Sequence, residues 1–248
     1  MLNIKNKWIL ITGSSRGLGR LMAEELAKTG CNLILQSRDK KNTLDIENTV
    51  KANGGVAVSF SCDLGNKEDL LSFIDALDSY DIDIVYNNAG MQVTYRPEIF
   101  DTTYEDYETS FRVNTIAPMM ICYKLAPKMI AKGFGRIVNT TSGIDNEPEQ
   151  GPYSASKAGL DKTTKDLNKL FAGKNIFAFL TDPGWCRTDL GGNSAPNDPK
   201  SAVNGLLAPG LIESTDKVSF KGMIHAQDYV DMSLEDIVKG IEDGRFPL

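Results

Sequence analysis

Histidine is nearly absent from this chain of 248 residues, and its scarcity narrows the chemistry that the chain supports. The single histidine, His225, disfavours a catalytic triad or a metal site built on imidazoles, and we expect it at a strand end or on the surface. Cysteine is scarce too, and no C-x-x-C pair occurs among Cys31, Cys62, Cys122 and Cys186. Widely spaced cysteines argue against a zinc site and are typical of free thiols in a reducing compartment. We therefore predict that no metal takes part.

Long apolar runs and clusters of basic residues are missing as well. No apolar stretch approaches the roughly 20 residues that a membrane-spanning helix requires. The first residues, MLNIKNKWILITG, lack the apolar core and cleavage site of a signal peptide. The net charge is −6, so we expect neither nucleic acid nor a membrane as a partner. These absences predict a cytoplasmic protein that acts on a small molecule.

Short apolar runs alternate with longer amphipathic segments along the chain. We expect strands at 8–12, 31–36, 56–62, 83–87, 136–141 and 176–181, and a short one at 222–226. We expect helices at 18–29, 42–52, 67–78, 104–131, 153–171, 201–213 and 233–244. Apolar strands separated by helices indicate a parallel sheet covered on both faces, because each right-handed crossover requires a helix. We predict an α/β fold over residues 1–248, a single doubly wound Rossmann-type domain with about seven strands.

No repeat or linker divides the chain, but residues 191–201 are rich in glycine, proline, asparagine and serine, GGNSAPNDPKS. This composition predicts a loop. Two roles stay open for the loop, a plain surface connection and a mobile lid. Together with its flanks, residues 185–213, it forms the expected substrate-loop segment.

The stretch TGSSRGLG, directly after the first expected strand, places Gly13, Gly17 and Gly19 at the start of a helix. Glycines let the backbone turn tightly and approach a pyrophosphate, while the helix N-terminus offers free N–H groups to the anion. The spacing GxxxGxG differs from the common GxGxxG fingerprint, so the turn indicates a nucleotide without identifying it. A glycine-rich turn without a ligand is the alternative.

The stretch YSASK places Tyr153 and Lys157 four residues apart, which is one turn of a helix. Such a pair also arises by chance on a solvated helix. Of the eight tyrosines in the chain, however, only Tyr153 is followed by a lysine at this distance. The pair therefore needs the rest of the sequence to explain it.

Several stretches together resemble the classical short-chain dehydrogenase/reductase family in composition, order and approximate spacing. They are TGSSRGLG at 12–19, NNAG at 87–90, VN at 113–114, Ser142, YSASK at 153–157 and PGWCRTD from Pro183. The resemblance covers the chain from about residue 5 to residue 190, and the combination is specific although each motif is weak. The phrase GWCRTDLGG is similar to a carbonyl-reducing branch of the family.

The resemblance implies that Tyr153 is the acid–base residue, which protonates a carbonyl oxygen while hydride arrives from a nicotinamide ring. Free tyrosine has a pKa near 10. Lys157, together with the oxidised nicotinamide, is expected to lower that pKa and to hold the nicotinamide ribose hydroxyls.

The resemblance also assigns Ser142 to the substrate oxygen and Asn114 to a water that connects the lysine with solvent. The interval of eleven residues between Ser142 and the tyrosine is shorter than we expect for the family, which leaves Thr141 as an alternative hydroxyl. The alternative role of Asn114 is that of a buried asparagine at a helix break before Pro118.

For the cofactor, the family implies that Asp63 contacts adenine and that NNAG forms the wall under the adenosine ribose. Thr188 is expected at the nicotinamide amide or the pyrophosphate, and the Pro183 segment against the nicotinamide. The expected cofactor-binding residues are Gly13, Ser15, Arg16, Gly17, Leu18, Gly19, Ser37, Arg38, Asp63, Leu64, Asn88, Ala89, Gly90, Tyr153, Lys157, Pro183, Gly184, Cys186 and Thr188.

The stretch LQSRDK, at the end of the second expected strand, indicates NADP rather than NAD. NAD-preferring proteins of this fold place an acidic residue here, which repels a 2′-phosphate. The matching position is Ser37, and Arg38 and Arg16 offer two cations to the phosphate. The alternatives are that both arginines are solvated, or that a register error of two residues puts Asp39 at this position.

We predict an NADPH-dependent oxidoreductase that reduces a ketone or aldehyde to an alcohol. A 3-oxoacyl-thioester reductase is one alternative, which a basic patch at the pocket mouth would favour because its carrier is acidic. The other is a catalytically silent NADP-sensing regulator, although such proteins usually lose the tyrosine or the lysine. The family pairs subunits through helices like 104–131 and 153–171, so we expect a homodimer or homotetramer. Candidate pocket residues, which fit the core equally well, are Met91, Tyr95, Trp185 and Leu190.

Overall fold

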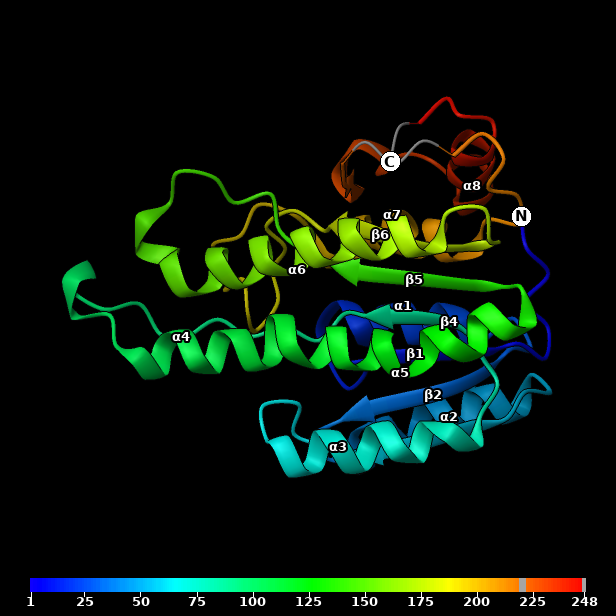
Figure 1. The fold of residues 1–248 in the computed structure, drawn as a ribbon, viewed down its shortest axis with the longest axis horizontal. Coiled ribbons are helices and arrows are strands. Elements are labelled where there is room, and N and C mark those ends of the chain that lie inside the picture. Colours follow the sequence, from blue (N-terminus) through cyan, green and yellow to red (C-terminus); the bar gives the residue numbers. More distant parts are fainter. Residues whose placement is uncertain (219–221, 247–248) are drawn as a thin grey trace.

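A seven-stranded parallel sheet forms the centre of the computed structural model, which describes residues 1–218 and 222–246 (Figure 1). The strand order is β3-β2-β1-β4-β5-β6-β7, and every neighbouring pair is parallel. The predicted α/β, doubly wound fold is therefore confirmed. The strands are β1 (Trp8–Thr12), β2 (Asn32–Ser37), β3 (Ala57–Ser61), β4 (Ile82–Asn87), β5 (Gly135–Thr140), β6 (Ile176–Asp182) and β7 (Ile224–His225).

Helices cover both faces of the sheet, because alternate side chains of the central strands point into two separate cores. In β1, Ile9 and Ile11 join one core and Leu10 joins the other. The first core is closed by α1 (Gly17–Leu26), α2 (Leu44–Ala52), α7 (Pro199–Leu207) and α8 (Leu234–Glu242). The second core is closed by α3 (Lys67–Ala76), α5 (Ala117–Lys132) and α6 (Gly151–Phe171), which lie in front of the sheet in Figure 1.

The helix expected at 104–131 is interrupted, which corrects the prediction. It consists of α4 (Tyr104–Phe111), a π-helical turn over Arg112–Ile116 and α5. A π-turn admits an extra residue and turns a side chain toward a neighbouring element, and such turns are frequent at functional sites. The helix expected at 201–213 is also shorter, since α7 ends at Leu207 and a 3₁₀ turn, Ala208–Leu211, follows it.

The strand order reverses between β1 and β4, and this reversal positions the site. The connections after these two strands run to opposite sides and leave a crevice at the carboxyl ends, where ligands of doubly wound proteins bind. Strands from both ends of the chain share one sheet. That residues 1–248 form a single domain stays a prediction. In the described part of the chain, no helix is long and apolar enough to cross a membrane.

Candidate active site

The glycine turn after β1 is pressed against the loop that follows β4. Gly13 has φ +68°, in the left-handed region, and a Cβ added there would lie 3.0 Å from Ala89 Cα. A Cβ at Gly19 would overlap the carbonyl oxygen of Gly13. The Asn88 amide fixes the two segments together, because its Nδ2 donates to the Thr12 carbonyl at 3.1 Å. Only glycine therefore permits this close approach.

A buried glutamine supports the glycine turn, and our sequence analysis missed it. Gln36, in β2, accepts a hydrogen bond from Gly13 N through its Oε1 at 2.9 Å and donates from Nε2 to the Cys62 carbonyl at 2.8 Å. The Ser14 hydroxyl donates to the Gln36 carbonyl at 3.1 Å. The available signal was a polar residue inside an apolar strand, since a buried polar side chain requires partners.

A cleft of about 480 Å³ opens beside this turn and collects most of the expected cofactor residues. It is lined by all of them except Gly19, Gly184 and Cys186. Gly19 packs under the turn, and the Cys186 thiol is buried and donates to the Pro183 carbonyl at 3.3 Å. Further lining residues, which the sequence analysis did not assign to the cofactor, are Gln36, Cys62, Met91, Gln92, Val113, Thr140, Thr141, Asp189 and Leu190.

Tyr153 and Lys157 project from the first turns of α6 toward the end of β5. Both are buried, and Lys157 Nζ donates to the Thr140 carbonyl at 2.7 Å. The same ammonium lies 5.8 Å from the centroid of the Tyr153 ring. The helical spacing thus does place the pair on one face, beside the cleft.

The pKa values of this pair are governed by burial. Burial raises the pKa of Tyr153 to about 12, and the Ser142 hydroxyl partly opposes the shift. Burial also lowers the pKa of Lys157 to about 8, which Asp161 and Asp182 partly oppose. The chain alone therefore does not show the expected lowering of the tyrosine pKa, because burial disfavours the charged phenolate.

Asn114 lies in the π-turn and joins three elements. Its Nδ2 donates to the Met91 carbonyl at 2.8 Å and to Ser156 Oγ at 3.0 Å, while its Oδ1 accepts from Met91 N at 2.9 Å. A Cβ at Gly90 would lie 3.5 Å from Lys157 Nζ and 3.6 Å from Asn114 Oδ1. Asn114 thus holds the loop after β4 against α6, close to the lysine.

The structure distinguishes the two hydroxyls at the end of β5. Ser142 is partly exposed and acts on the pKa of Tyr153. Thr141 is buried, and its side chain acts instead on the pKa of Asp161, a residue farther along α6. Ser142 is therefore the hydroxyl that acts on the tyrosine, whereas Thr141 lines the cleft and Ser142 does not.

At the end of β2, the residues expected to read the ribose phosphate take different roles. Ser37 is buried and donates to the Asp39 carbonyl at 2.8 Å, while the Asp39 carboxylate accepts from Lys41 N at 3.0 Å. Ser37 and Arg38 line the cleft and Asp39 does not. Arg16 pairs with Asp189 at 2.5 Å, so its positive charge already has a partner in this structure.

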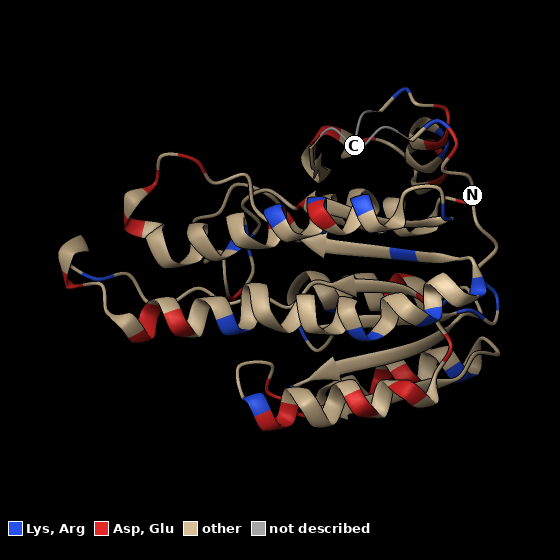
Figure 2. Ribbon diagram, in the orientation of Figure 1, with Lys and Arg blue, Asp and Glu red and all other residues tan. Residues whose placement is uncertain are grey.

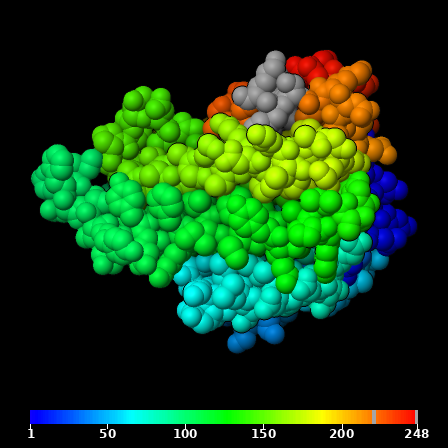
Figure 3. All heavy atoms as spheres, in the orientation of Figure 1, coloured from blue at the N-terminus to red at the C-terminus, as the bar shows by residue number. Residues whose placement is uncertain are grey.

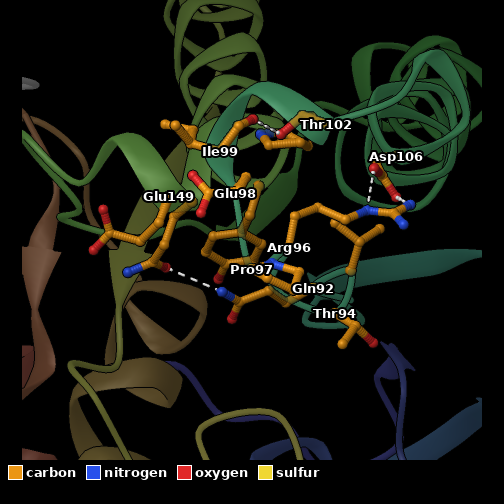
Figure 4. A pocket seen from close by; sticks show the side chains of 13 residues that line it. Gln92, Thr94, Arg96, Pro97, Glu98, Ile99, Thr102, Asp106 and Glu149 are labelled. Atoms are coloured by element: carbon orange, nitrogen blue, oxygen red, sulfur yellow. Dashed lines mark hydrogen bonds and ion pairs between the residues drawn. The ribbon is translucent and has the colours of Figure 1, made fainter.

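A second cavity, of about 260 Å³, adjoins the cleft (Figure 4). Gln92 and Tyr153 line both spaces, so the tyrosine lies where they meet. The walls of the second cavity come from residues 92–106 and 149–153. Of the candidate pocket residues, Met91 and Leu190 line the cleft, Tyr95 accepts a hydrogen bond from Gln92, and Trp185 is exposed and lines neither space.

The single histidine lies at the end of β7, as we expected, and contacts a carboxylate near the tyrosine. His225 Nδ1 is 3.1 Å from Asp182 Oδ2, and Asp182 Oδ1 accepts from Gly184 N at 2.9 Å. A Cβ at Gly143 would lie 2.8 Å from Asp182 Oδ2, the oxygen that His225 contacts. The pair thus packs against the loop that follows Ser142, a contact that only the folded chain reveals.

The doubly wound sheet, the glycine turn and the cleft at the strand ends define a protein of the dinucleotide-binding, Rossmann type. The model of the short chain dehydrogenase family matches residues 7–199. The chain therefore belongs to the short-chain dehydrogenase family, as the sequence motifs predicted.

Two of the similar curated proteins act on acyl groups by their names. The ketoacyl reductase HetN of Nostoc sp. is 30% identical over 214 residues, which are 84% of this chain and 73% of that protein. The 3-oxoacyl-(acyl-carrier-protein) reductase FabG of Rickettsia typhi is 33% identical over 192 residues, 77% of each chain. An uncharacterized oxidoreductase of Mycobacterium bovis is 33% identical over 180 residues, 70% of this chain, and the chain spans about half, 53%, of that relative's length.

Solved structures repeat the fold. A short-chain dehydrogenase from Sphingobium yanoikuyae in complex with NADPH has a TM-score of 0.72 and 28% identity, over 81% of this chain and 82% of that one. The bulky-bulky ketone specific alcohol dehydrogenase from Comamonas testosteroni has a TM-score of 0.71 and 27% identity, over 81% of both chains.

Proposed function

We propose that this protein reduces a ketone or aldehyde to an alcohol with NADPH as the hydride donor. The observation that carries the proposal is the position of Tyr153, which lines both the cleft beside the glycine turn and the adjoining cavity. A cofactor in one space and a carbonyl compound in the other would meet at this side chain. Proton transfer requires such proximity between the acid and the reacting oxygen.

The cleft fits a dinucleotide. The N-terminus of α1 has no side-chain cap, so its first N–H groups remain available to an anion. The glycine turn lets the backbone approach that anion closely. Asp63 and Leu64 line the cleft and are assigned to the adenine, and Asn88, Ala89 and Gly90 to the adenosine ribose.

When bound, NADPH supplies the hydride that reduces the carbonyl carbon. Tyr153 donates its hydroxyl proton to the carbonyl oxygen, and Ser142 donates a hydrogen bond to the same oxygen and orients it. Lys157 binds the nicotinamide ribose hydroxyls and places a positive charge beside the phenolate that forms. Asn114 positions the loop after β4 and α6 around the lysine.

The assignment of NADPH over NADH rests on the end of β2. Ser37 replaces the acidic residue that would repel a 2′-phosphate, and the carboxylate of Asp39 is occupied by its own turn. Arg38 lines the cleft and offers a cation to the phosphate. The NADPH complex of the similar Sphingobium yanoikuyae protein supports the same choice.

Two other functions remain as competitors. The similarity to HetN and FabG favours a reductase of 3-oxoacyl thioesters. A silent sensor of NADP is disfavoured because both Tyr153 and Lys157 are retained and buried together.

We further propose a homodimer or homotetramer. Exposed apolar side chains lie on the helices that pair subunits in this family, among them Tyr104, Tyr107, Met120, Tyr123 and Leu170. Sedimentation at micromolar concentration tests the assembly, and a monomer would contradict it.

All four cysteines are free and buried, which supports the predicted cytoplasmic location.

The direct test of the function follows NADPH absorbance with a panel of aldehydes, diketones, steroids, sugars and acyl thioesters. Oxidation of NADPH with a ketone or aldehyde is the expected result. Turnover of acyl thioesters alone would favour the competing reductase. NADP binding without turnover of any member would favour the sensor.

A further inference from the structure

The two segments that wall the second cavity are strongly acidic. Residues 92–112 and 143–152 contain eight carboxylates and two arginines, with no lysine. Both arginines are paired within their own segment: Arg96 bonds Asp106 at 2.8 and 3.0 Å, and Arg112 bonds Glu108 at 3.1 Å. In the part of the chain that the structure describes, the remaining six carboxylates form no ion pair: Glu98, Asp101, Glu105, Asp145, Glu147 and Glu149.

Arg96 is the cation of these segments that lines the cavity, and its charge is paired with that of Asp106. Figure 4 shows the Arg96 side chain extended to Asp106, while Glu98 and Glu149 lie on the other side of the space. Figure 2 shows the acidic segments gathered at one end of the molecule, around α4 and the loop before α6, and Figure 3 shows the same two parts of the chain projecting at that end. The charge at the rim is therefore left uncompensated by the walls themselves.

The pKa of Glu147 reflects the crowding of carboxylates in one of these segments. It is raised because the Glu149 carboxyl group shares a hydrogen bond with it and carries a like charge. Like charges in one region disfavour ionisation of each other, so a raised carboxyl pKa records their proximity. Glu149, which lines the cavity, thus has a second carboxylate beside it.

The interior next to the tyrosine is polar but neutral. Gln92 Nε2 donates to Gln150 Oε1 at 3.2 Å and to Tyr95 Oη at 2.7 Å, which ties the two walls together. Gln92 lines both spaces and adjoins the loop that Asn114 holds. Amide groups of this kind bind hydroxyl, ether or amide groups of a substrate and do not neutralise a carboxylate.

From the acidic rim and the neutral interior we infer that the cavity selects carbonyl substrates by charge. This inference rests on the proposed function. Cationic ketones are preferred to neutral ones, and neutral ones to anionic ones. Glu98 and Glu149 are the specificity-determining residues, because they alone of the unpaired carboxylates line the cavity. The inference disfavours an acidic carrier, whose docking would require a basic patch at this mouth.

The test uses three methyl ketones that share one propyl chain and end in a trimethylammonium, methoxy or carboxylate group. We expect kcat/KM to fall in that order at low ionic strength, by about tenfold from the neutral to the anionic ketone, for two partly exposed charges. Added salt should narrow the difference, because screening weakens exposed charges.

The double variant Glu98→Gln/Glu149→Gln should lose most of this discrimination and retain reduction of the methoxy ketone. The control Asp231→Asn/Glu235→Gln removes the same two charges near α8, far from the cavity, and should keep the order of the wild type. An anionic ketone reduced best, or an order unchanged in the Glu98/Glu149 variant, would overturn the inference. If none of the three ketones is reduced although another ketone or aldehyde is, the inference is overturned and the proposed function stands. If no ketone or aldehyde is reduced at all, the proposed function itself fails.

Discussion

At the scale of single residues, the tyrosine hydroxyl is the group on which the proposed chemistry depends. Burial keeps its pKa high, so Tyr153 is protonated at neutral pH and ready to act as an acid. In the oxidative direction the same burial opposes the phenolate. The positive charge of an oxidised nicotinamide, added to that of Lys157, would favour the phenolate again.

Replacement of Tyr153 by phenylalanine tests this role. The ring stays in place and the proton is lost, so turnover should slow by about 10²-fold to 10⁴-fold. NADPH affinity should remain nearly unchanged. Steady-state kinetics and a fluorescence titration of NADPH measure the two quantities. Tyr80→Phe, a tyrosine that packs on Trp8 at the opposite end of the sheet, is the matched control, and near-normal turnover in Tyr153→Phe would refute the mechanism.

The lowered pKa of Lys157 predicts a pH dependence of cofactor binding. The ammonium of the free protein loses its proton as the pH rises through about 8, so its contribution to binding is complete below this pH and disappears above it. NADPH affinity should then fall by up to about tenfold per pH unit above the break. Lys157→Met should bind NADPH weakly with no break near this pH. A break that persists in the variant would assign the titration to another group.

At the scale of elements, the strands were predictable because buried parallel strands are nearly continuous apolar runs, as NLILQ and IVYN illustrate. The π-turn over Arg112–Ile116 was not, because it depends on Asn114 finding partners in the loop at Met91 and on α6 at Ser156. The contact of His225 with Asp182 has the same origin. These features arise from tertiary contacts, and no local pattern encodes them.

Some parts of the candidate site could be predicted from the sequence and others could not, as with the helices and strands. Motifs that combine a turn with the chemistry of one side chain, such as the glycine turn and YSASK, lie where we expected. Roles that depend on relative position were less accessible. Arg16 is paired with Asp189 across the cleft, and the supporting role of Gln36 requires β3 beside β2.

The end of β2 carries the prediction on cofactor choice. We expect the wild type to prefer NADPH, because Arg38 offers a cation and Ser37 adds no negative charge. Ser37→Asp combined with Arg38→Leu should reduce the ratio of kcat/KM for NADPH over NADH by about tenfold or more, the value of one charge-assisted hydrogen bond. Arg245→Leu removes an exposed arginine elsewhere and should leave the ratio unchanged. A wild type that prefers NADH would contradict the assignment.

At the scale of the whole molecule, a buried arginine connects the sheet with the segment that follows α7. Arg136, in β5, is fully buried, and its guanidinium donates to the carbonyls of Ile212, Gly135, Asn175 and Glu213 at 2.9–3.1 Å. Burial lowers its pKa to about 10, so it remains charged at neutral pH. The guanidinium thereby joins the start of β5 to Ile212 and Glu213, and its own buried N–H groups find acceptors there.

Replacement of Arg136 by methionine, which retains much of the apolar stem, should therefore lower the free energy of unfolding by about 3 kcal/mol, because the hydrogen bonds between β5 and the segment after α7 are lost. Urea denaturation followed by circular dichroism measures the change. Arg136 lies at the start of β5, whereas Tyr153 lies near the end of that strand. The folded variant should therefore keep the kcat of the wild type. Lys124→Met, which removes a cation of exposed ion pairs to Asp75 and Asp78, is the control and should cost less than about 1 kcal/mol. Equal stability of the two variants would show that the guanidinium network does not stabilise the fold.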